Sequence, residues 1–277
     1  MIECIKMHGN GNDFIVINNM ELRYGAEFLS DLAAKACRRR ESVGADGLIV
    51  AEPSHSTDFK MRIFNPDGSE GEMCGNGARC VSRYALEFGI AKSRDLTFET
   101  LGGMVHAVVN GDRVTLDLAP VSLDGVIRDG HVSVGGCEFE YFFVMVGVPH
   151  CVIFERERSR SFEEYAPIGR AIRNRRDLFP HGTHVNFVVM DDEKDAIDIM
   201  TYERGVEDMT LSCGTGSAAS SIASWLSGRT GPVVRVKNPG GVNNVTLSQS
   251  ETGDILPKLE GCTLFVAKIL ILSEALR

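Results

Sequence analysis

The sequence predicts an α/β (α+β) protein built from two similar, pseudo-symmetric domains. Short β-like runs alternate with a few helical segments along the chain. The chain also contains an internal repeat, in which MCGNGARCVSRYALEFG from Met73 aligns with SCGTGSAASSIASWLSG from Ser212. Each copy continues into a β-like run and a pair of glycines, at 102–103 and 240–241. Two copies are too few for a solenoid, so the repeat indicates a pseudo-twofold pair of domains with a boundary near Ala119.

The strands are predicted from apolar and β-branched runs bounded by Gly, Asn or Pro. In the first half these runs are 15–18, 48–51, 59–65 and 96–100, followed by a hairpin over 104–118 with an Asn-Gly-Asp turn. In the second half they are 140–155 (two strands around a Gly-Val-Pro-His turn), 184–191, 195–203, 233–238, 243–247 and the C-terminal run 263–272. Helices are predicted over 27–40, over 163–174 and directly after each Cys-Gly-x-Gly motif.

Composition limits the classes of function. The chain has 277 residues with 43% hydrophobic and 24% charged residues, as a soluble globular protein has. Its net charge of -9 and the lack of a basic face argue against nucleic acid or a membrane surface as partner, and Arg38 to Arg40 are expected at an exposed helix end. The N-terminus has no apolar segment of signal-peptide length, and the C-terminal apolar run is interrupted by Lys268. These features predict a cytoplasmic protein.

The chain has eight cysteines, and none of them form a Cys-x-x-Cys pair. The spacings of zinc ribbons and of thioredoxin-like motifs are therefore missing, and no metal site is predicted. In a reducing compartment most of these residues are expected to be buried thiols that pack as small hydrophobes. Cys74 and Cys213 differ, because each one opens a copy of the repeat.

Both repeat cysteines are predicted at helix N-termini. A helix start presents unpaired N–H groups and the positive end of the dipole, so a thiol there loses its proton more readily. The neighbouring glycines let backbone amides approach an anion, which makes each motif a candidate carboxylate cradle. Inversion of a Cα stereocentre needs a base on one face and an acid on the other. A thiolate and a thiol supply both.

Other motifs have ordinary interpretations on sequence alone. GNGNDF resembles the dinucleotide-binding fingerprint, but Phe14 replaces its third glycine and the motif precedes a strand. His8 and His150 are compatible with plain turn residues, and Glu203 with Arg204 is compatible with a surface ion pair. A cysteine hydrolase or transferase using Cys74 with His150 and a non-catalytic binding module both remain as alternatives.

Several segments, in order along the chain, resemble the diaminopimelate epimerase family. They are MHGNGNDFIVIN, FNPDGSEGEMCGNGARC, GVPHCVIF, HVNFV and YERGVEDMTLSCGTGSAAS. The resemblance implies a two-base epimerase, independent of pyridoxal phosphate and of any other cofactor, that interconverts LL- and meso-diaminopimelate for lysine and peptidoglycan synthesis. It also implies two domains, each a mixed or antiparallel sheet wrapped around a central helix, with residues 1–118 plus 264–277 in one and 119–263 in the other. The expected partners are a small amino-acid substrate and a second copy of the chain in a homodimer.

The resemblance also implies roles for individual residues. Cys74 and Cys213 would be the acid–base thiols, and His150 and Glu203 would tune them. The backbone cradle for the reacting carboxylate would come from Gly75, Asn76, Gly214 and Thr215. The residues that would hold the rest of the substrate are Asn12, Asn65, Asn186, Glu203 and Arg204, with Arg204 on the distal carboxylate and Glu203 on the distal ammonium.

Two positions depart from the family pattern. The family often has Gly-Asn-Pro-His before its histidine, where this chain has Gly147-Val148-Pro149-His150. Val148 cannot make the asparagine's hydrogen bond to the distal end of the substrate. Gly47 stands where some members have glutamine. Neither change touches the cysteines, so the alternative function is a related cofactor-independent racemase with another amino-acid substrate, such as histidine.

Overall fold

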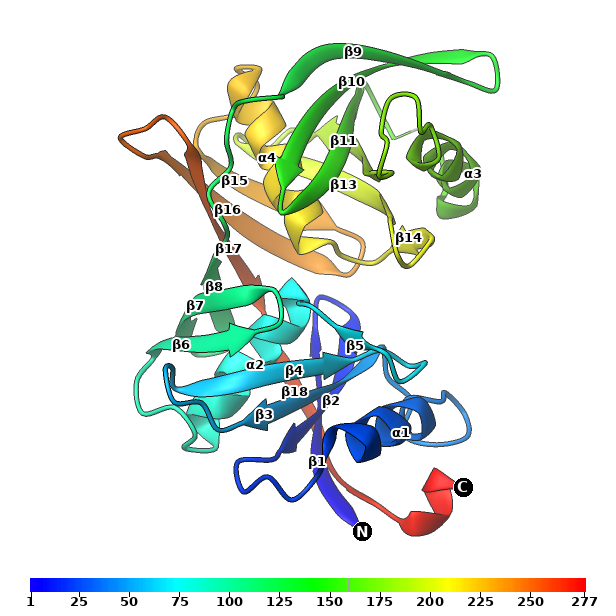
Figure 1. The fold of residues 1–277 in the computed structure, drawn as a ribbon. Helices are drawn as coiled ribbons and strands as arrows, with labels where there is room; N and C mark the ends of the chain where they lie inside the picture. Colours follow the sequence, from blue (N-terminus) through cyan, green and yellow to red (C-terminus); the bar gives the residue numbers. More distant parts are fainter. Residues whose placement is uncertain (159) are drawn as a thin grey trace. The chain divides into compact units, whose positions relative to one another are not determined.

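The structure, a computed structural model, describes residues 1–158 and 160–277. The chain divides into two compact units, which we describe separately: residues 1–116 with 261–277 form unit 1, and residues 117–260 form unit 2. Figure 1 shows that both are built mainly of strands, with one helix running through the middle of each. Within the described residues, no helix is long and apolar enough to cross a membrane.

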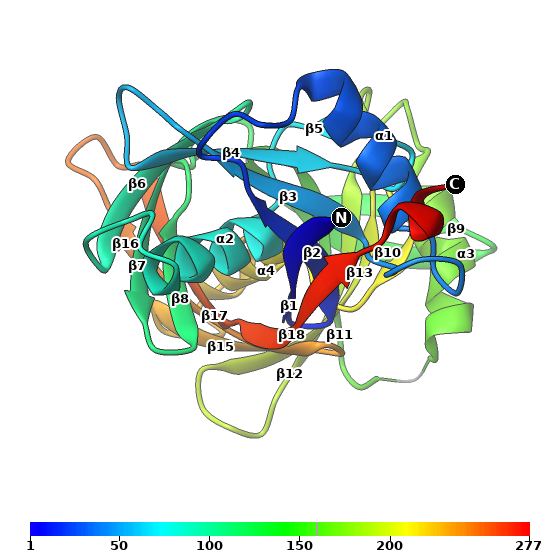
Figure 2. The same cartoon turned by 90° about the horizontal axis from the view of Figure 1, so that it is seen from below.

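Unit 1 is a twisted sheet around the helix α2 (Figure 2). The sheet runs in the order β18-β1-β2-β3-β4-β6-β7-β8, with β2–β3 and β4–β6 parallel and the other pairs antiparallel. Its strands are β1 (Ile2–Gly9), β2 (Asn12–Asn18), β3 (Gly47–Glu52), β4 (Phe59–Phe64), β5 (Glu70–Gly71), β6 (Asp95–Thr100), β7 (Gly103–Asn110), β8 (Arg113–Asp117) and β18 (Leu264–Ile271). The helices are α1 (Ala26–Ala36), α2 (Gly75–Glu87) and the short 3-10 helix η1 (Ser273–Leu276), which contacts α1.

Unit 2 repeats this order. Its sheet runs β9-β10-β11-β12-β13-β15-β16, and its parallel pairs are β11–β12 and β13–β15. The strands are β9 (Ile127–Val134), β10 (Cys137–Val146), β11 (Val148–Glu155), β12 (His184–Met190), β13 (Ala196–Glu203), β14 (Asp208–Thr210), β15 (Val233–Asn238), β16 (Gly241–Gln249) and β17 (Ile255–Cys262). The helices are α3 (Phe162–Arg173) and α4 (Gly214–Leu226). Element by element, β1 to β7 correspond to β10 to β16, and α1 and α2 to α3 and α4.

Both central helices are buried over most of their length; α4 is small or apolar on nearly every side, whereas α2 also buries the polar Asn76 and Arg79. In α4 all nine residues from Gly216 to Ser224 are buried. Ser217, Ser221 and Ser224 donate their hydroxyls to the carbonyl four residues earlier, as Ser221 does to Ser217 (2.8 Å), whereas the buried Ser220 hydroxyl has no partner. Each helix is followed by a glycine in the left-handed region, Gly89 (φ 70°) and Gly228 (φ 67°), which ends it without a Cβ clash.

The predicted helices and the hairpin at 104–118 are confirmed, with two differences. The first helix ends at Ala36 instead of residue 40, because the chain curls back there: the Gly44 N–H donates to the Ala36 carbonyl (2.9 Å), and Arg40 lies in the left-handed region. The predicted Gly-Val-Pro-His turn is only one residue long. Val146 pairs with Val148 across Gly147 (φ 68°), so Val148 and His150 belong to β11. Strands β1, β5, β9, β14 and β17 were not predicted as such.

Candidate active site

Both repeat cysteines occupy the N-cap position of a central helix. Cys74 (φ -138°, ψ 121°) precedes α2, and Cys213 (φ -110°, ψ 117°) precedes α4. Each carbonyl accepts the first intrahelical bond, from Ala78 N (2.7 Å) and Ser217 N (2.9 Å). The predicted position of the two thiols at helix starts is confirmed.

The paired glycines of the repeat hold the segments that carry the thiols. Gly102 N donates to the carbonyl of Glu72 (3.0 Å), and Gly240 N donates to that of Leu211 (2.8 Å). Each acceptor lies two residues before a cysteine, so the same hairpin turn positions the same loop in both units. This correspondence explains why the sequence repeat extends from each cysteine to its glycine pair.

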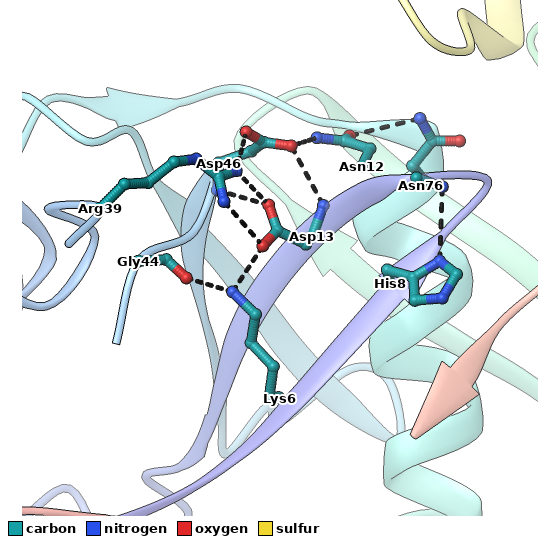
Figure 3. Close-up of polar contacts among 9 residues, drawn as sticks. Lys6, His8, Asn12, Asp13, Arg39, Gly44, Asp46 and Asn76 are labelled. Carbon is teal, nitrogen blue, oxygen red and sulfur yellow. Dashed lines mark hydrogen bonds and ion pairs between the residues drawn. The ribbon is translucent and has the colours of Figure 1, made fainter. Parts of the chain in front are cut away.

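In unit 1, the Cys74 thiol is bonded to Asn12, which is bonded in turn to Asn76. Cys74 Sγ donates to Asn12 Oδ1 (3.5 Å), and the same oxygen accepts from Asn76 Nδ2 (3.2 Å). Asn12 begins β2 and Asn76 lies in the first turn of α2 (Figure 3). Three of the predicted site residues therefore lie in one hydrogen-bonded group.

A charged cluster continues from Asn12, as Figure 3 shows. Asn12 Nδ2 donates to Asp46 Oδ2 (2.7 Å), and Arg39 bridges Asp46 (2.7 Å) and Asp13 (2.6 Å). Lys6 also pairs with Asp13 (2.6 Å). The cluster joins β1, β2 and the loop that enters β3. Arg39 is exposed, as predicted, but it lies beyond the end of α1 and pairs with both aspartates.

Among the residues that the structure describes, Arg79 is the largest fully buried side chain. Its Nη2 donates to Asn76 Oδ1 (2.7 Å), while Nε and Nη1 are buried with no hydrogen-bond partner. Burial lowers the pKa of Arg79, and the thiols of Cys80, Cys74 and Cys262 act in the opposite direction. Within the described residues, no carboxylate pairs with this guanidinium.

The remaining predicted residues of unit 1 are more open. Asn65 is exposed just beyond β4, where its Nδ2 donates to Ser69 Oγ (2.9 Å). Gly75 is half-buried, and a Cβ there would meet no atom within 4 Å. The amides at the start of α2 have no partner within the helix, as in any first turn.

In unit 2, the Cys213 sulfur accepts a hydrogen bond from the first turn of α4. Gly216 N donates to it (3.3 Å), and Thr215 Oγ1 lies 3.5 Å away. Gly216 is required there, because an added Cβ would lie 2.5 Å from Asn186 Oδ1. The side chain of Cys74 makes no such cap bond, so the two thiols differ in their hydrogen bonds.

Asn186 lies on β12, fully buried beneath α4. Its Nδ2 donates to the Cys151 carbonyl (3.2 Å) and to His150 Nδ1 (3.2 Å), and its Oδ1 accepts from Thr201 (2.9 Å). Because His150 Nδ1 accepts, its proton sits on Nε2. Asn186 was predicted to contact substrate, but the structure brings it to His150 instead of to an open surface.

His150 and His184 stack, with ring centroids 4.7 Å apart. Burial, followed by the charges of His184 and Arg204, holds the pKa of His150 well below its usual value. Burial, with Arg204 and Arg173, lowers the pKa of His184 to about 4. Both imidazoles are therefore neutral at pH 7.

Glu203 ends β13, and burial raises its pKa. One ligand-type atom of each of Glu203, His184 and Cys213 lies within 4.8 Å of the others. These residue types also bind zinc, but burial raises the pKa of Glu203, which disfavours the ionised carboxylate that a metal ion requires. The arrangement therefore fits proton handling better than metal binding. Arg204 is half-buried and donates to the His181 carbonyl (3.0 Å).

Three residues of the site were not predicted from the sequence: His184, Asp46 and Arg79. His184 could have been found from strand alternation, because it lies two residues before Asn186 and shares its face. Arg79 could have been found in a similar way, because it lies three residues after Asn76 on the same face of α2, whereas Asp46 lies 34 residues from its partner Asn12 and gave no local signal.

The charged cluster makes a prediction about acid stability. Partial burial acts to raise the pKa of Asp13, but hydrogen bonds from Arg39 and Lys6 outweigh it and lower that pKa to about 2. A depressed folded-state pKa contributes stability that is present above pH ~4 and lost as the pH falls toward ~2. We expect Asp13→Asn to lower the free energy of unfolding by about 1 kcal/mol at pH 7, after discounting for solvent screening.

The measurement is urea unfolding of both proteins from pH 7 down to pH 2. The difference between them should shrink below pH ~4. A constant difference over the whole range would show that the Asp13 charge does not contribute.

Comparisons with known proteins agree with this architecture. The family model described as diaminopimelate epimerase matches residues 4–123 and 142–256. A diaminopimelate epimerase of Caldanaerobacter subterraneus subsp. tengcongensis is 43% identical over 252 residues, which cover 86% of this chain and 89% of the relative. One of Desulfitobacterium hafniense is 38% identical over 99% of this chain and all of the relative.

Solved structures show the same fold at low identity. A PhzF-family phenazine biosynthesis protein of Bacillus anthracis superimposes with a TM-score of 0.76 at 15% identity, over 98% of this chain and 99% of that one. A probable proline racemase of Agrobacterium radiobacter, solved with bound carbonate, gives 0.73 at 17% identity, over 98% and 93%. The predicted fold, with strands around two central helices in two similar halves, is confirmed. From its motifs, its fold and its identity to these relatives, the chain belongs to the diaminopimelate epimerase family.

Proposed function

We propose that Cys74 and Cys213 are the two acid–base groups of the epimerase, each acting on one face of the substrate α-carbon. The observation that carries this proposal is their equivalent position, at the N-cap of the central helix in each repeat. The family assignment makes the chain an isomerase that epimerises diaminopimelate. The two halves predicted from sequence, 1–118 with 264–277 and 119–263, are proposed as the two epimerase halves.

In the proposed mechanism one thiolate removes the α-proton and the other thiol returns a proton to the opposite face. The Cα–H electron pair moves into the carboxylate, which takes on enediolate character. The first-turn amides of α2 and α4, at Gly75, Asn76, Gly214 and Thr215, face this charge and stabilise it. Acid–base action alone supplies about 10²–10⁴-fold, so these preorganised amides must contribute much of the rest.

The other predicted site residues are assigned to the distal end of the substrate. Arg204 pairs with the distal carboxylate, Glu203 accepts from the distal ammonium, and Asn12 and Asn65 hold the substrate through their amides. For Asn186 we propose a positioning role, supported by its burial and its bond to His150. Burial lowers the pKa of His150 and raises that of Glu203, so it disfavours the charged form of both groups near Cys213. No cofactor is assigned a role.

The test is epimerisation in D₂O. Incubation with LL-diaminopimelate should load deuterium at one α-carbon and yield the meso isomer, as followed by NMR and mass spectrometry. Absence of exchange by the reduced, folded enzyme would refute the proposal.

A second candidate is a related racemase that acts on another amino acid, such as histidine. Val148 favours it. The strand registers make Val148 of β11 equivalent to Asn12 of β2, so one of two matching amides is replaced by an apolar side chain. A substrate panel decides between the two: kcat/KM on histidine above that on diaminopimelate would favour the racemase.

We assign the second copy of the predicted homodimer to the β18 face of unit 1. This strand leaves Leu264, Val266 and Leu270 about half exposed, an apolar surface that a partner would cover. Leu270→Lys is expected to shift the mass measured by light scattering from dimer to monomer, whereas Lys258→Glu should not. A wild-type protein that is monomeric at all concentrations would contradict the assignment.

A cytoplasmic location is supported by the buried thiols of Cys4, Cys37, Cys80 and Cys151.

A further inference from the structure

We infer that Arg79 is a positioning residue of the epimerase, and that the reacting carboxylate of the substrate is the counter-ion of its buried guanidinium. The charge acts through the first turn of α2, which the proposed function uses as part of the carboxylate cradle. The inference therefore rests on that function and adds a fixed positive charge beneath the cradle. Its evidence is a fully buried cation that no acid of the described residues neutralises.

Arg79 lies inside unit 1, fully buried. Its Nη2 donates to Asn76 Oδ1 (2.7 Å), whereas Nε and Nη1 have no hydrogen-bond partner. The titratable groups that act on the guanidinium are thiols, those of Cys80, Cys74 and Cys262. Burial of a charged group is strongly unfavourable unless an opposite charge and hydrogen bonds compensate for it. The side chains of the described residues therefore leave this positive charge uncompensated.

The guanidinium keeps its charge in this environment. Burial lowers the pKa of Arg79, but the free group has a pKa above ~12 and arginine is not deprotonated in proteins. An apolar side chain of similar volume would fill the same space without an uncompensated charge. A buried charge that the fold does not need is typical of a functional position, where a protein is less stable than its fold allows.

The charge lies at the end of α2 that begins with Cys74. Arg79 is in the second turn of this helix, and long helical side chains lean toward the helix N-terminus. Its bond to Asn76, three residues earlier, follows this direction. The amides of the first turn and the positive end of the helix dipole lie at the same end. A carboxylate bound there would interact with the helix dipole and with a full positive charge.

The charge belongs to unit 1 alone. Alignment of the two repeat cysteines places Ala218 at the position of Arg79, and Ala218 is fully buried in α4. In unit 1, β1 passes close to the guanidinium at Gly9, where an added Cβ would lie 3.5 Å from Arg79 Nη2. The two copies of the cradle therefore differ in charge, and Arg79 acts on the carboxylate from the α2 side.

The substrate carboxylate gains negative charge during the reaction. When the catalytic thiolate takes the α-proton, the Cα–H electron pair moves into the carboxylate, and the other thiol then returns a proton to Cα. Arg79 neither gives nor takes a proton in these steps. Its fixed charge stabilises the more negative transition state more than the bound substrate, so its loss should lower kcat more than it raises KM.

Three replacements separate the charge from the hydrogen bond. Arg79→Lys keeps the charge and a donor, Arg79→Gln keeps an amide donor without the charge, and Arg79→Met keeps neither. We expect kcat for LL-diaminopimelate to fall roughly 10–100-fold in Arg79→Gln and Arg79→Met, with KM changed less than about threefold. Arg79→Lys should keep more than about a tenth of the wild-type kcat. Equal kcat values in Arg79→Lys and Arg79→Gln would overturn the inference, whether or not Arg79→Met folds.

Stability distinguishes this role from a structural one. Without substrate, Arg79→Met should unfold at or above the wild-type melting temperature, because an uncompensated buried charge is removed. The matched control in α2 is Arg83→Met. Arg83 packs over the Phe265 ring (4.6 Å) and donates to the Thr263 carbonyl (2.6 Å), so its loss should lower the melting temperature and leave kcat unchanged. The pattern of the control, if Arg79→Met showed it, would make Arg79 a purely structural residue.

A binding measurement identifies the counter-ion. The rise in melting temperature is measured with an equilibrated mixture of LL- and meso-diaminopimelate, and with their diamides, in which neutral amides replace the carboxylates. The acids should raise it more than the diamides do, and this difference should be larger in wild type and Arg79→Lys than in Arg79→Met. Arg204 is present in every protein, so its proposed contact with the distal carboxylate cancels. The same difference in wild type and Arg79→Met would exclude the carboxylate as the counter-ion.

These outcomes can be distinguished from failure of the proposed function. Exchange by the wild type in D₂O, together with an unchanged kcat in Arg79→Gln and Arg79→Met, would remove only the role of Arg79 and leave the two-thiol function in place. Absence of exchange by the wild type would refute the function itself.

Discussion

Replacing either Cys74 or Cys213 by serine is expected to reduce epimerisation at least ~10³-fold. A serine hydroxyl holds its proton too tightly to act as the base, and removal of one acid–base group costs about 10²–10⁴-fold. Both sulfurs lie at helix N-caps, where the positive end of the helix dipole stabilises a thiolate. A serine hydroxyl stays protonated there and gains nothing from this stabilisation. The measurement is the rate of formation of the meso isomer from LL-diaminopimelate, with circular dichroism to confirm folding.

The two variants should also differ in a second way. Cys74→Ser keeps the Cys213 base and should still exchange the α-proton of one epimer with solvent, without inversion. Cys213→Ser should exchange the other epimer. Cys137→Ser, at an exposed cysteine of β10, is the control and should retain full activity. Near-normal activity of Cys213→Ser together with a trapped acyl-enzyme would instead support a hydrolase with Cys74 as its only nucleophile.

Gly216→Ala is expected to destabilise the protein by about 2 kcal/mol and to lower its activity at least ~10-fold. The new Cβ would lie 2.5 Å from Asn186 Oδ1 and 3.1 Å from Thr201 Oγ1. Asn186 is fully buried and bonded on both ends of its amide, so it has no room to move. The clash can be removed only if the first turn of α4 shifts. This shift breaks the hydrogen bond from Gly216 N to Cys213 Sγ.

Gly77→Ala is the matched control, because Gly77 holds the same position in α2. Its Cβ would meet Ile49 Cδ1 at 2.9 Å and Met61 Cε at 3.3 Å, and both are ends of flexible side chains. The usual gain of about 1 kcal/mol for alanine over glycine in a helix then offsets the crowding. Thermal denaturation should show a drop of roughly 5 °C for Gly216→Ala and little change for Gly77→Ala. Equal drops in melting temperature for the two variants would mean that the Asn186 side chain moves aside as easily as the methyl groups near Gly77 do.

The position of each thiol at a helix start was predictable from sequence because it depends on local pattern. Cys-Gly-x-Gly before a helical run places a thiol at a helix N-cap, and this held for both Cys74 and Cys213. Glycines at 89 and 228 marked the helix ends for the same reason, since each needs a positive φ. The starts and ends of these helices depend only on residues within about one helical turn of each other.

The residues that orient these groups could not be predicted in the same way. Asp46 reaches Asn12 across 34 positions, and His184 stacks on His150 across two parallel strands. Asn186 was assigned to substrate from its motif, whereas its burial beneath α4 makes it a partner of His150. Strand pairing decides these contacts, and single-sequence patterns do not fix which distant strands pair.

By itself the sequence determined the twofold repeat, the four helices, the place of each thiol at a helix start and the family. Tertiary structure decided how the two thiols differ. Both cysteines have nearly the same neighbours in sequence, but Asn12 reaches Cys74 from β2, and Gly216 caps Cys213 under the constraint of Asn186 on β12. The direction of a hydrogen bond depends on which donor or acceptor the fold brings to the sulfur, and those groups come from other strands of the sheet.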